Sequence, residues 1–276
     1  MYLLHRETLR LLMNKVLESL KMLPGLLELR RWRYEKQFAS HQIANYFRGV
    51  YDSFDEAVAE APDSKPVGYD NDQAASMYKE RTERIYGTDY PVLYWMNRLE
   101  GQFETIFDFG GHIGIHYYSY APYLNYSGLK NWQVCDVPSV VEEARKFVRY
   151  QSTSILEFTN KIESCDGKDL FLANGSLQYL DWELHEKLAK LSRPPKFLIV
   201  NMTPLHEKIK TITLQSIGAS FCPYYLRLRN DFVDGLKAIG YELLDEWENE
   251  QKACKIAFEP ERSLDYYKGM IFELEK

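Results

Sequence analysis

The sequence lacks the features that mark disulfide-rich, metal-binding and membrane-spanning proteins. It has four cysteines in 276 residues, none of them in a CxxC pair or beside histidines at the spacing of a zinc site. Scattered cysteines in a chain of this length do not form a disulfide framework, so we expect a cytoplasmic protein without a bound metal. No uncharged apolar run approaches the roughly 18 residues that a membrane-spanning helix needs.

An excess of positive charge is also missing. The chain carries 34 Lys and Arg against 40 Asp and Glu, a net charge of -6, so nucleic acid is not an expected partner. Charged residues at His5, Arg6 and Glu7 interrupt any apolar segment of a signal peptide. What is present is a hydrophobic content of 45% and 21 tyrosines, which is typical of a globular protein with a sizeable core.

The first hundred residues read as an N-terminal helical region. The apolar spacing in residues 1–36 predicts a helix broken near Pro24, with eight basic and four acidic residues. Such a basic amphipathic helix either lies on a membrane surface as a peripheral contact or packs on the body or on a partner chain. Further helices are expected over 37–60, 73–86 and 89–100, with a loop at 61–72.

From Gly101 onward, short β-rich runs alternate with helical segments. Helices fit at about 113–125, 138–150, 181–191 and 228–239. The alternation predicts βαβ units and a mainly parallel, Rossmann-like α/β domain over 101–276, with a reversed last strand entering by a hairpin. The seven expected strands are 105–109, 132–136, 155–159, 170–174, 197–201, 241–247 and 270–274.

The first of these strands ends in the segment DFGGHIG, residues 108–114. Gly110 and Gly111 allow a tight turn and a close approach of the backbone to a ligand, and Gly114 allows the next helix to pack near the strand. The segment is not the GxGxxG of dinucleotide sites, because Phe109 takes the place of its first glycine. Asp108, just before the glycines, suits a ligand with a cationic amino group better than a pyrophosphate.

The second strand ends in Asp136, 22 residues after Gly114. A carboxylate at this point can accept hydrogen bonds from both hydroxyls of a ribose. Two local roles are open as alternatives: Asp108 as a turn former, and Asp136 as the N-cap of the following helix.

The sequence resembles a family of class I S-adenosylmethionine-dependent methyltransferases encoded among bacterial surface-polysaccharide genes. This chain differs in having Asn201 where many of those proteins have a basic residue, and Asp136 where many have Glu. The resemblance covers about residues 45–276 and rests on FRGVYDSFDEAVAEA (47–61), GYD (68–70), DFGGHIG (108–114), WQVCDVP (132–138), NGSLQYL (174–180), IVNMTP (199–204), TLQ (213–215) and GYELLDEW (240–247).

The resemblance implies an S-adenosylmethionine-dependent enzyme whose acceptor is a small molecule or glycan, such as a sugar nucleotide or glycan precursor of a surface polysaccharide. Asn160 and Ile162 would then hold the adenine, and Gly175 and Ser176 would lie where the methionine end meets the acceptor. The implied cofactor site comprises Asp108, Gly110, Gly111, Gly114, Asp136, Val137, Asn160, Ile162, Gly175 and Ser176.

A hydroxyl acceptor must lose its proton as it attacks the methyl group, and histidine is the usual base near neutral pH. His112 lies within the glycine turn and His116 one helical turn further on, so these two are the candidate bases. Two rival functions remain open. The first is an enzyme that uses a nucleotide sugar, for which Asp70-Asn71-Asp72 resembles a DxD metal motif; the second is a non-catalytic interaction module on the same fold. The sequence does not indicate an oligomeric state.

Overall fold

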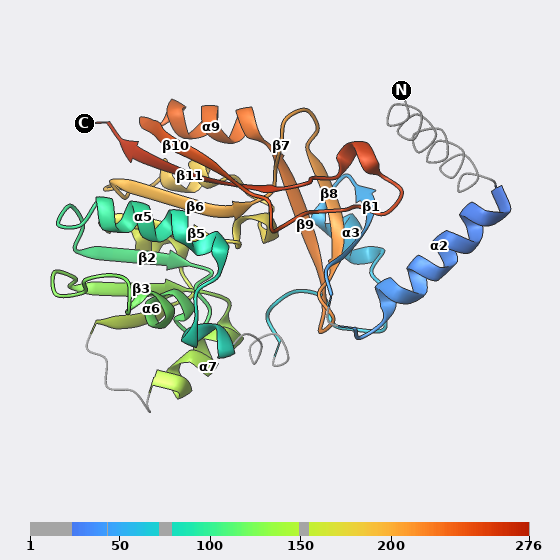
Figure 1. Ribbon diagram of the computed structural model, residues 1–276, viewed down its shortest axis with the longest axis horizontal. Coiled ribbons are helices and arrows are strands. Elements are labelled where there is room, and N and C mark those ends of the chain that lie inside the picture. Colours follow the sequence, from blue (N-terminus) through green and yellow to red (C-terminus); the bar gives the residue numbers. More distant parts are fainter. Residues whose placement is uncertain (1–23, 43, 72–78, 149–154, 276) are drawn as a thin grey trace, which may run out of the picture.

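A seven-stranded sheet forms the centre of the molecule (Figure 1). The computed structural model describes residues 24–42, 44–71, 79–148 and 155–275. The strand order is β10-β11-β6-β5-β2-β3-β4, and β11 is antiparallel to both of its neighbours whereas the pairs from β6 to β4 are all parallel. All seven expected strands, including the reversed one, are confirmed: β2 (Thr105–Phe109), β3 (Asn131–Cys135), β4 (Leu156–Thr159), β5 (Leu170–Asn174), β6 (Phe197–Thr203), β10 (Tyr241–Asn249) and β11 (Tyr267–Leu274).

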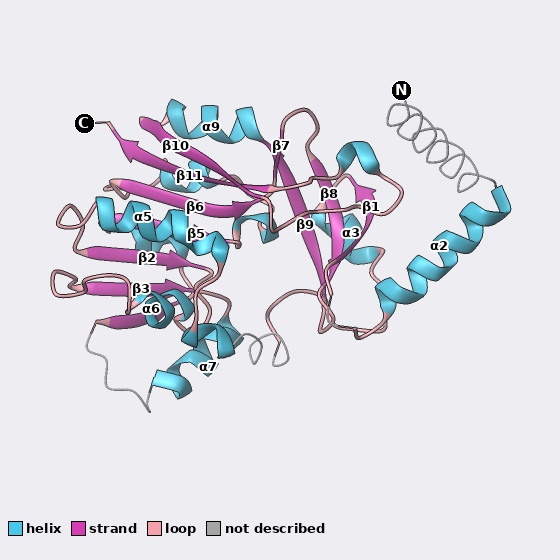
Figure 2. Ribbon diagram, in the orientation of Figure 1, coloured by secondary structure: helices cyan, strands magenta, loops and turns pink. Residues whose placement is uncertain are grey.

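Both faces of this sheet are covered, which explains the almost continuous apolar runs of its central strands. Neighbouring residues such as Phe171 and Leu172 point to opposite faces and enter two separate cores. One core includes side chains of α8 (Leu184–Leu188) and α9 (Arg229–Ala238). The other includes side chains of α5 (Tyr90–Arg98) and α6 (Ile115–Tyr120). Helix α7 (Pro138–Val148) follows β3, and Figure 2 shows these helices around the sheet.

A second, four-stranded sheet was not expected from the sequence. Its order is β1-β8-β9-β7, formed by β1 (Tyr46–Tyr51), β7 (Leu205–His206), β8 (Thr211–Ser216) and β9 (Phe221–Leu228). In Figure 1 it stands beside the carboxyl ends of the parallel strands, so it faces the edge where open α/β sheets bind their ligands.

The expected helix over 37–60 is therefore wrong in its middle part. Residues 46–51 pair with β8 instead, and Phe47 is buried between the strands and the chain near Ile256. The helix that does follow, α3 (Phe54–Ala59), begins where the Ser53 side chain accepts a hydrogen bond from the Glu56 amide. The long-range pairing outweighed the local helical pattern.

The other helices and the loop expected in the N-terminal region are confirmed in part. Helix α2 is described over Pro24–Ala39. Residues 1–23 lie outside the described residues, so the expected break near Pro24 stays a prediction. The expected loop after residue 60 is confirmed up to residue 71. In the described part of the helix expected over 73–86, the structure has only the 3-10 turn η1 (Lys79–Glu83). The turn η2 (Gly87–Asp89) follows, and α5 then lies within the helix expected over 89–100. The domain boundary at residue 100 stays a prediction.

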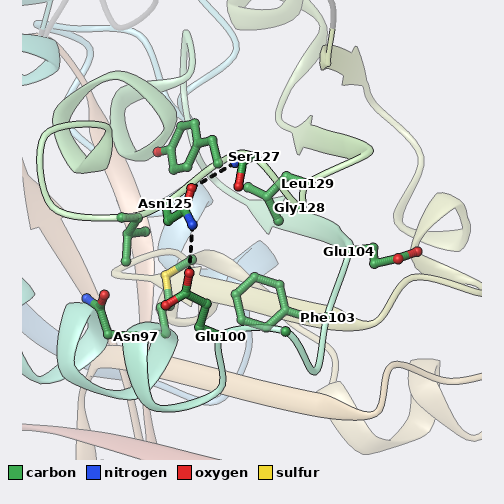
Figure 3. Close-up of a pocket in the computed structure, with 12 residues that line it drawn as sticks. Asn97, Glu100, Phe103, Glu104, Asn125, Ser127, Gly128 and Leu129 are labelled. Carbon is green, nitrogen blue, oxygen red and sulfur yellow. Dashed lines mark hydrogen bonds between the residues drawn. The ribbon is translucent and has the colours of Figure 1, made fainter.

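No helix in the described part of the chain is long and apolar enough to cross a membrane. A small cavity of about 180 Å³ lies at the amino ends of β2 and β3 (Figure 3). Its wall is stabilised by Asn125, whose side-chain amide donates a 2.8 Å hydrogen bond to the carboxylate of Glu100. This cavity lies at the edge of the sheet opposite to the glycine turn.

Asn201, at the carboxyl end of the buried strand β6, ties the elements of the ligand-binding edge together. Its side chain is fully buried and its Nδ2 donates to the carbonyl oxygen of Thr88 at 2.8 Å and to Oδ1 of Asn174 at 3.1 Å. Its Oδ1 accepts from the indole of Trp247 at 2.9 Å and from Asn249 at 3.0 Å. The side chain thus joins β5, β6, β10 and the segment before α5.

We expect Asn201→Leu, which keeps a similar volume, to lower the free energy of unfolding by about 3 kcal/mol, because two donors and two acceptors lose their partners. Urea denaturation measures this. The matched control is Asn230→Leu at the exposed start of α9, for which we expect a change within about 0.5 kcal/mol. Equal effects of the two substitutions would show that the buried hydrogen bonds contribute little net stability.

Candidate functional site

A cavity of about 840 Å³ lies at the carboxyl ends of the parallel strands, under the second sheet. This volume is near the upper end of the range for small-molecule sites, about 300–1,000 Å³. Its floor comes from the turns that follow β2, β3, β4 and β5, and its roof from β9 and from segments before α5 and after β10. Of the predicted site residues, Gly110, His112, His116, Asp136, Val137, Asn160, Ile162, Gly175 and Ser176 line it; Asp108, Gly111 and Gly114 do not.

The glycine turn after β2 requires glycine for reasons of both conformation and space. Gly110 has φ of 77° and Gly114 has φ of 92°, in the region that side chains rarely adopt. A Cβ on Gly110 would lie 2.3 Å from Cβ of Ser176, and one on Gly111 would lie 2.4 Å from Oδ2 of Asp108. His112 itself has φ of 55°, and this conformation holds its ring at the cavity wall.

Asp108 lies behind this turn, away from the cavity, and is fully buried. Its carboxylate contacts Nδ1 of His116 at 2.9 Å and accepts a hydrogen bond from the indole of Trp132 at 3.2 Å. Its position in β2 explains this, because Asp108 alternates with Phe107 and so faces the core under α6. The carboxylate is thus held by His116 and Trp132, and its expected contact with a cationic ligand stays a prediction.

Asp136 does reach the cavity, at the end of β3. Its Oδ2 accepts a hydrogen bond from the backbone amide of His112 at 2.9 Å, and its Oδ1 one from that of Val137 at 2.8 Å. Burial raises the pKa of Asp136 to about 6, in spite of these two amides, which favour the ionised form. Asp136 thus connects the glycine turn to the turn after β3 and presents a carboxylate to any ligand between them.

In the segment Asp70-Asn71-Asp72, which resembles a DxD motif, the two described residues form hydrogen bonds within the protein. Oδ1 of Asp70 accepts a hydrogen bond from the amide of Ser139 at 2.8 Å, which caps the first turn of α7, and the Asn71 side chain donates to the carbonyl of Gly68. Asp72 lies outside the described residues. Among the residues that are described, no three His, Cys, Asp or Glu side chains gather as metal ligands would.

The turns after β4 and β5 complete the floor. Asn160 is exposed at its edge and Ile162 is half-buried against the core. Gly175 has φ of 81°, and the hydroxyl of Ser176 donates a 2.7 Å hydrogen bond to the carbonyl of Phe109, which locks the β5 turn to the β2 turn. Four strand ends are thereby held as one surface.

Two histidines, His112 and His116, line the cavity. Burial alone would lower the pKa of His116, but the neighbouring Asp108 carboxylate outweighs it and the pKa is raised. His116 therefore keeps its proton to a higher pH, and an imidazolium cannot accept another. His112 is also buried at the cavity wall, and its place in the glycine turn makes it the other candidate for a base.

Several cavity residues come from segments that the sequence did not assign to the site. Asp89 is buried, and its carboxylate accepts hydrogen bonds from Tyr120 at 3.0 Å, from Asn174 at 2.9 Å and from the Tyr86 amide at 2.8 Å. Tyr179 also lines the cavity. The other unassigned lining residues include Arg81, Arg84, Tyr86, Tyr224, Lys252 and Tyr267. No local motif marks them, because tertiary packing alone brings them here.

No protein-family model and no curated protein matches this sequence. Solved structures resemble it at low similarity. They include an S-adenosylmethionine-dependent methyltransferase from Clostridium acetobutylicum (12% identity, 75% of this chain and 96% of that one, TM-score 0.44). Another is the 1,6-didemethyltoxoflavin-N1-methyltransferase of Burkholderia thailandensis with bound 1,6-didemethyltoxoflavin and S-adenosylhomocysteine (15%, 69% and 79%, 0.44). A third is the glycopeptide N-methyltransferase MtfA complexed with S-adenosylmethionine (9%, 68% and 94%, 0.45).

At TM-scores below 0.5, none of these likenesses decides what this chain binds. The strand order of the large sheet, with its single reversed strand β11, carries the classification instead. The chain has a Rossmann-like methyltransferase fold.

We expect Gly110→Ala to lower the free energy of unfolding by about 1–3 kcal/mol, because the new Cβ meets Ser176 and the backbone conformation disfavours it. Thermal unfolding is the measurement. Gly128→Ala is the control, since a Cβ there meets nothing within 4 Å; its effect should stay near zero. A Gly110→Ala protein as stable as the wild type would mean that the turn can relax.

Proposed function

We propose that this chain is an S-adenosylmethionine-dependent methyltransferase. The observation that carries the proposal is the position of Asp136, whose carboxylate closes the glycine turn from the next strand and faces the cavity at the carboxyl ends of a methyltransferase-type sheet. Carboxylates at this position suit the two hydroxyls of a ribose.

The donor and acceptor groups of the cavity fit the cofactor. Asp136 accepts from the ribose, Asn160 serves the adenine amino group, and Ile162 packs on the ring. At the methionine end, the carboxylate of Asp89, which lines the cavity, is a second candidate partner for the ammonium group beside that of Asp108. When bound, the cofactor supplies an electrophilic methyl group, and the chain's task is to orient the acceptor and take its proton.

The acceptor class rests on the sequence resemblance to methyltransferases encoded among surface-polysaccharide genes. We infer a sugar nucleotide or a glycan precursor, modified in the cytoplasm. The tyrosines of the roof support this class. Tyr179 packs edge-on against Tyr69 and Tyr224, and such amphipathic rings suit a sugar that is apolar on one face and hydroxylated at its rim.

S-adenosylhomocysteine should bind the wild-type protein and raise its melting temperature by mass action. We expect Asp136→Ala to weaken binding by about 1–3 kcal/mol, because the ribose hydroxyls lose a charged, shielded acceptor. Titration calorimetry measures both, with Asp181→Ala at an exposed position as the control. Unchanged affinity in Asp136→Ala would remove Asp136 from the site.

The same titration should depend on pH. Because the pKa of Asp136 is raised to about 6, the carboxylate is ionised above this pH and protonated below it. Affinity should be flat above pH 6 and fall about tenfold for each pH unit well below it. Asp136→Asn carries no titrating group, so a persisting pH dependence in this variant would assign the effect to another residue.

His112 is the candidate base. His112→Asn, which keeps a residue type tolerant of positive φ, should lower methyl transfer about 10²–10⁴-fold while barely changing the affinity for S-adenosylhomocysteine. The assay uses fractionated cell-envelope precursors as acceptors, with His116→Gln alongside. Full activity in both variants would exclude a histidine base, and a wild type that binds the cofactor but transfers nothing would favour the interaction module.

Helix α2 provides the proposed peripheral membrane contact. It projects from the body (Figure 1) and exposes Leu26, Leu29 and Trp32 on its surface, while four basic residues accompany two acidic ones in its sequence. An anionic lipid surface would meet both the apolar side chains and the positive charge.

In sedimentation with phosphatidylglycerol–phosphatidylcholine vesicles at low salt, the full-length protein should bind, and Leu29→Ser/Trp32→Ser should lose binding. Val58→Ser removes an equally exposed apolar side chain from α3 and should leave binding intact. If the wild type stays in the supernatant, α2 has a role other than lipid contact.

A further inference from the structure

His116 turns one ring nitrogen toward the protein and leaves the other open to the cavity. Its Nδ1 lies 2.9 Å and 3.1 Å from the two carboxylate oxygens of Asp108, and both residues are buried. Within the part of the chain that the structure describes, Nε2 of His116 has no hydrogen-bond partner, and it is not one of the polar atoms shut away from solvent. Since His116 lines the cavity, Nε2 is the ring nitrogen that a bound ligand can reach.

The charges around this ring favour its protonated form. Burial alone would favour the neutral ring, but Asp108 and then Asp89 outweigh burial and raise the pKa of His116, while Arg81 opposes them. With the ring protonated, these two carboxylates and two cations sum to zero. The acidic side chains of η1, which packs on α6, are both exposed: Glu80 and Glu83. A ligand that brings one charge of each sign keeps this balance, whereas a lone anion or a lone cation disturbs it.

Asp89 lies on the same side of the cavity as His116. Tyr120 contacts both, because its hydroxyl donates to Asp89 at 3.0 Å and its ring centroid lies 5.3 Å from that of His116. Asp89 also accepts from Asn174 at the end of β5, and His116 follows the turn after β2. In the order β5-β2-β3-β4, Asp136 comes next, after β3, and the turn after β4 comes last. The pair therefore lies at the end of the cavity opposite the turn proposed for the adenine.

We propose that the Nε2–H of a protonated His116, oriented by Asp108, binds the carboxylate at the methionine end of the cofactor. The assignment rests on the proposed methyltransferase function, in which the ribose, the adenine and the ammonium group have partners and the carboxylate has none. Hydrogen bonds between two ionised groups are about twice as strong as those between neutral ones. The ammonium group would face Asp89 and the carboxylate His116, so that each charge of the ligand meets an opposite one. Asp108 acts here through His116, as a positioning residue.

The test compares two ligands by titration calorimetry: S-adenosylhomocysteine, and decarboxylated S-adenosylhomocysteine, which keeps the amino group. At neutral pH the wild type should bind S-adenosylhomocysteine about tenfold or more tightly than the decarboxylated ligand. His116→Gln should weaken S-adenosylhomocysteine alone and bring the two affinities within about twofold of each other. His41→Gln, the same change at an exposed histidine, should behave as the wild type. Unchanged affinity for the decarboxylated ligand also reports that each variant is folded.

The preference for S-adenosylhomocysteine should also depend on pH. Asp136 is already ionised above about pH 6, so a change on the alkaline side belongs to another group. The preference should be full while His116 is protonated and should fall as the pH rises through its raised pKa. Asp108→Asn removes the carboxylate that keeps the ring protonated, so this fall should move to lower pH. A role of Asp108 in folding alone would leave the position of the fall unchanged.

Three results would overturn this assignment and leave the proposed function standing. They are equal affinity of the wild type for the two ligands, a preference that His116→Gln retains, and a preference that does not change on the alkaline side. If His116→Gln binds neither ligand, the pH profile of the wild type decides, because it needs no variant. If the wild type itself binds neither ligand, the methyltransferase function is refuted together with this assignment.

Discussion

The buried side-chain amide of Asn201 fixes the geometry on which the cavity depends. An amide can donate and accept at once, so this single group satisfies partners from four segments that would otherwise bring unpaired polar atoms into the core. A basic residue could not do this, because it has no acceptor for the indole of Trp247. The substitution that distinguishes this chain from the proteins it resembles thus belongs to a network of neutral and acidic partners.

That network has a direct effect on the site. It places the segment containing Thr88 and Asp89 across the ends of β5 and β6, and the same segment begins with Tyr86 and its two arginines. A carboxylate and two guanidinium groups that line the cavity are thereby attached to one short stretch of chain. Asp136, by contrast, is positioned by the large sheet alone. The two halves of the cavity have separate structural origins.

The separate origins of the two halves of the cavity explain which elements and site residues could be predicted from the sequence. The strands of the large sheet are continuous apolar runs between helices, and the glycine turn and Asp136 come directly after strand ends. The local sequence pattern was therefore enough to predict them. The small sheet was not predicted because β1 finds its partner far along the chain, and a pattern confined to residues 37–60 is compatible with a helix. Asp108 could have been placed from strand alternation, which sends it toward α6 and not toward the ligand. No local sequence pattern marked Arg84 or Lys252 as residues of the site.

The pairing of β1 with β8 has a consequence for the order of events during folding. The Gln215 side chain bonds to Asn45, 170 residues earlier, so the roof closes by a contact of very high sequence separation, whereas each βαβ unit of the floor closes locally. Long loops are entropically expensive to close and are completed late. We therefore expect the strands β2 to β5 of the floor to be synthesised while β1 still has no partner. The cavity would acquire its second wall only after residues 211–216 have been synthesised.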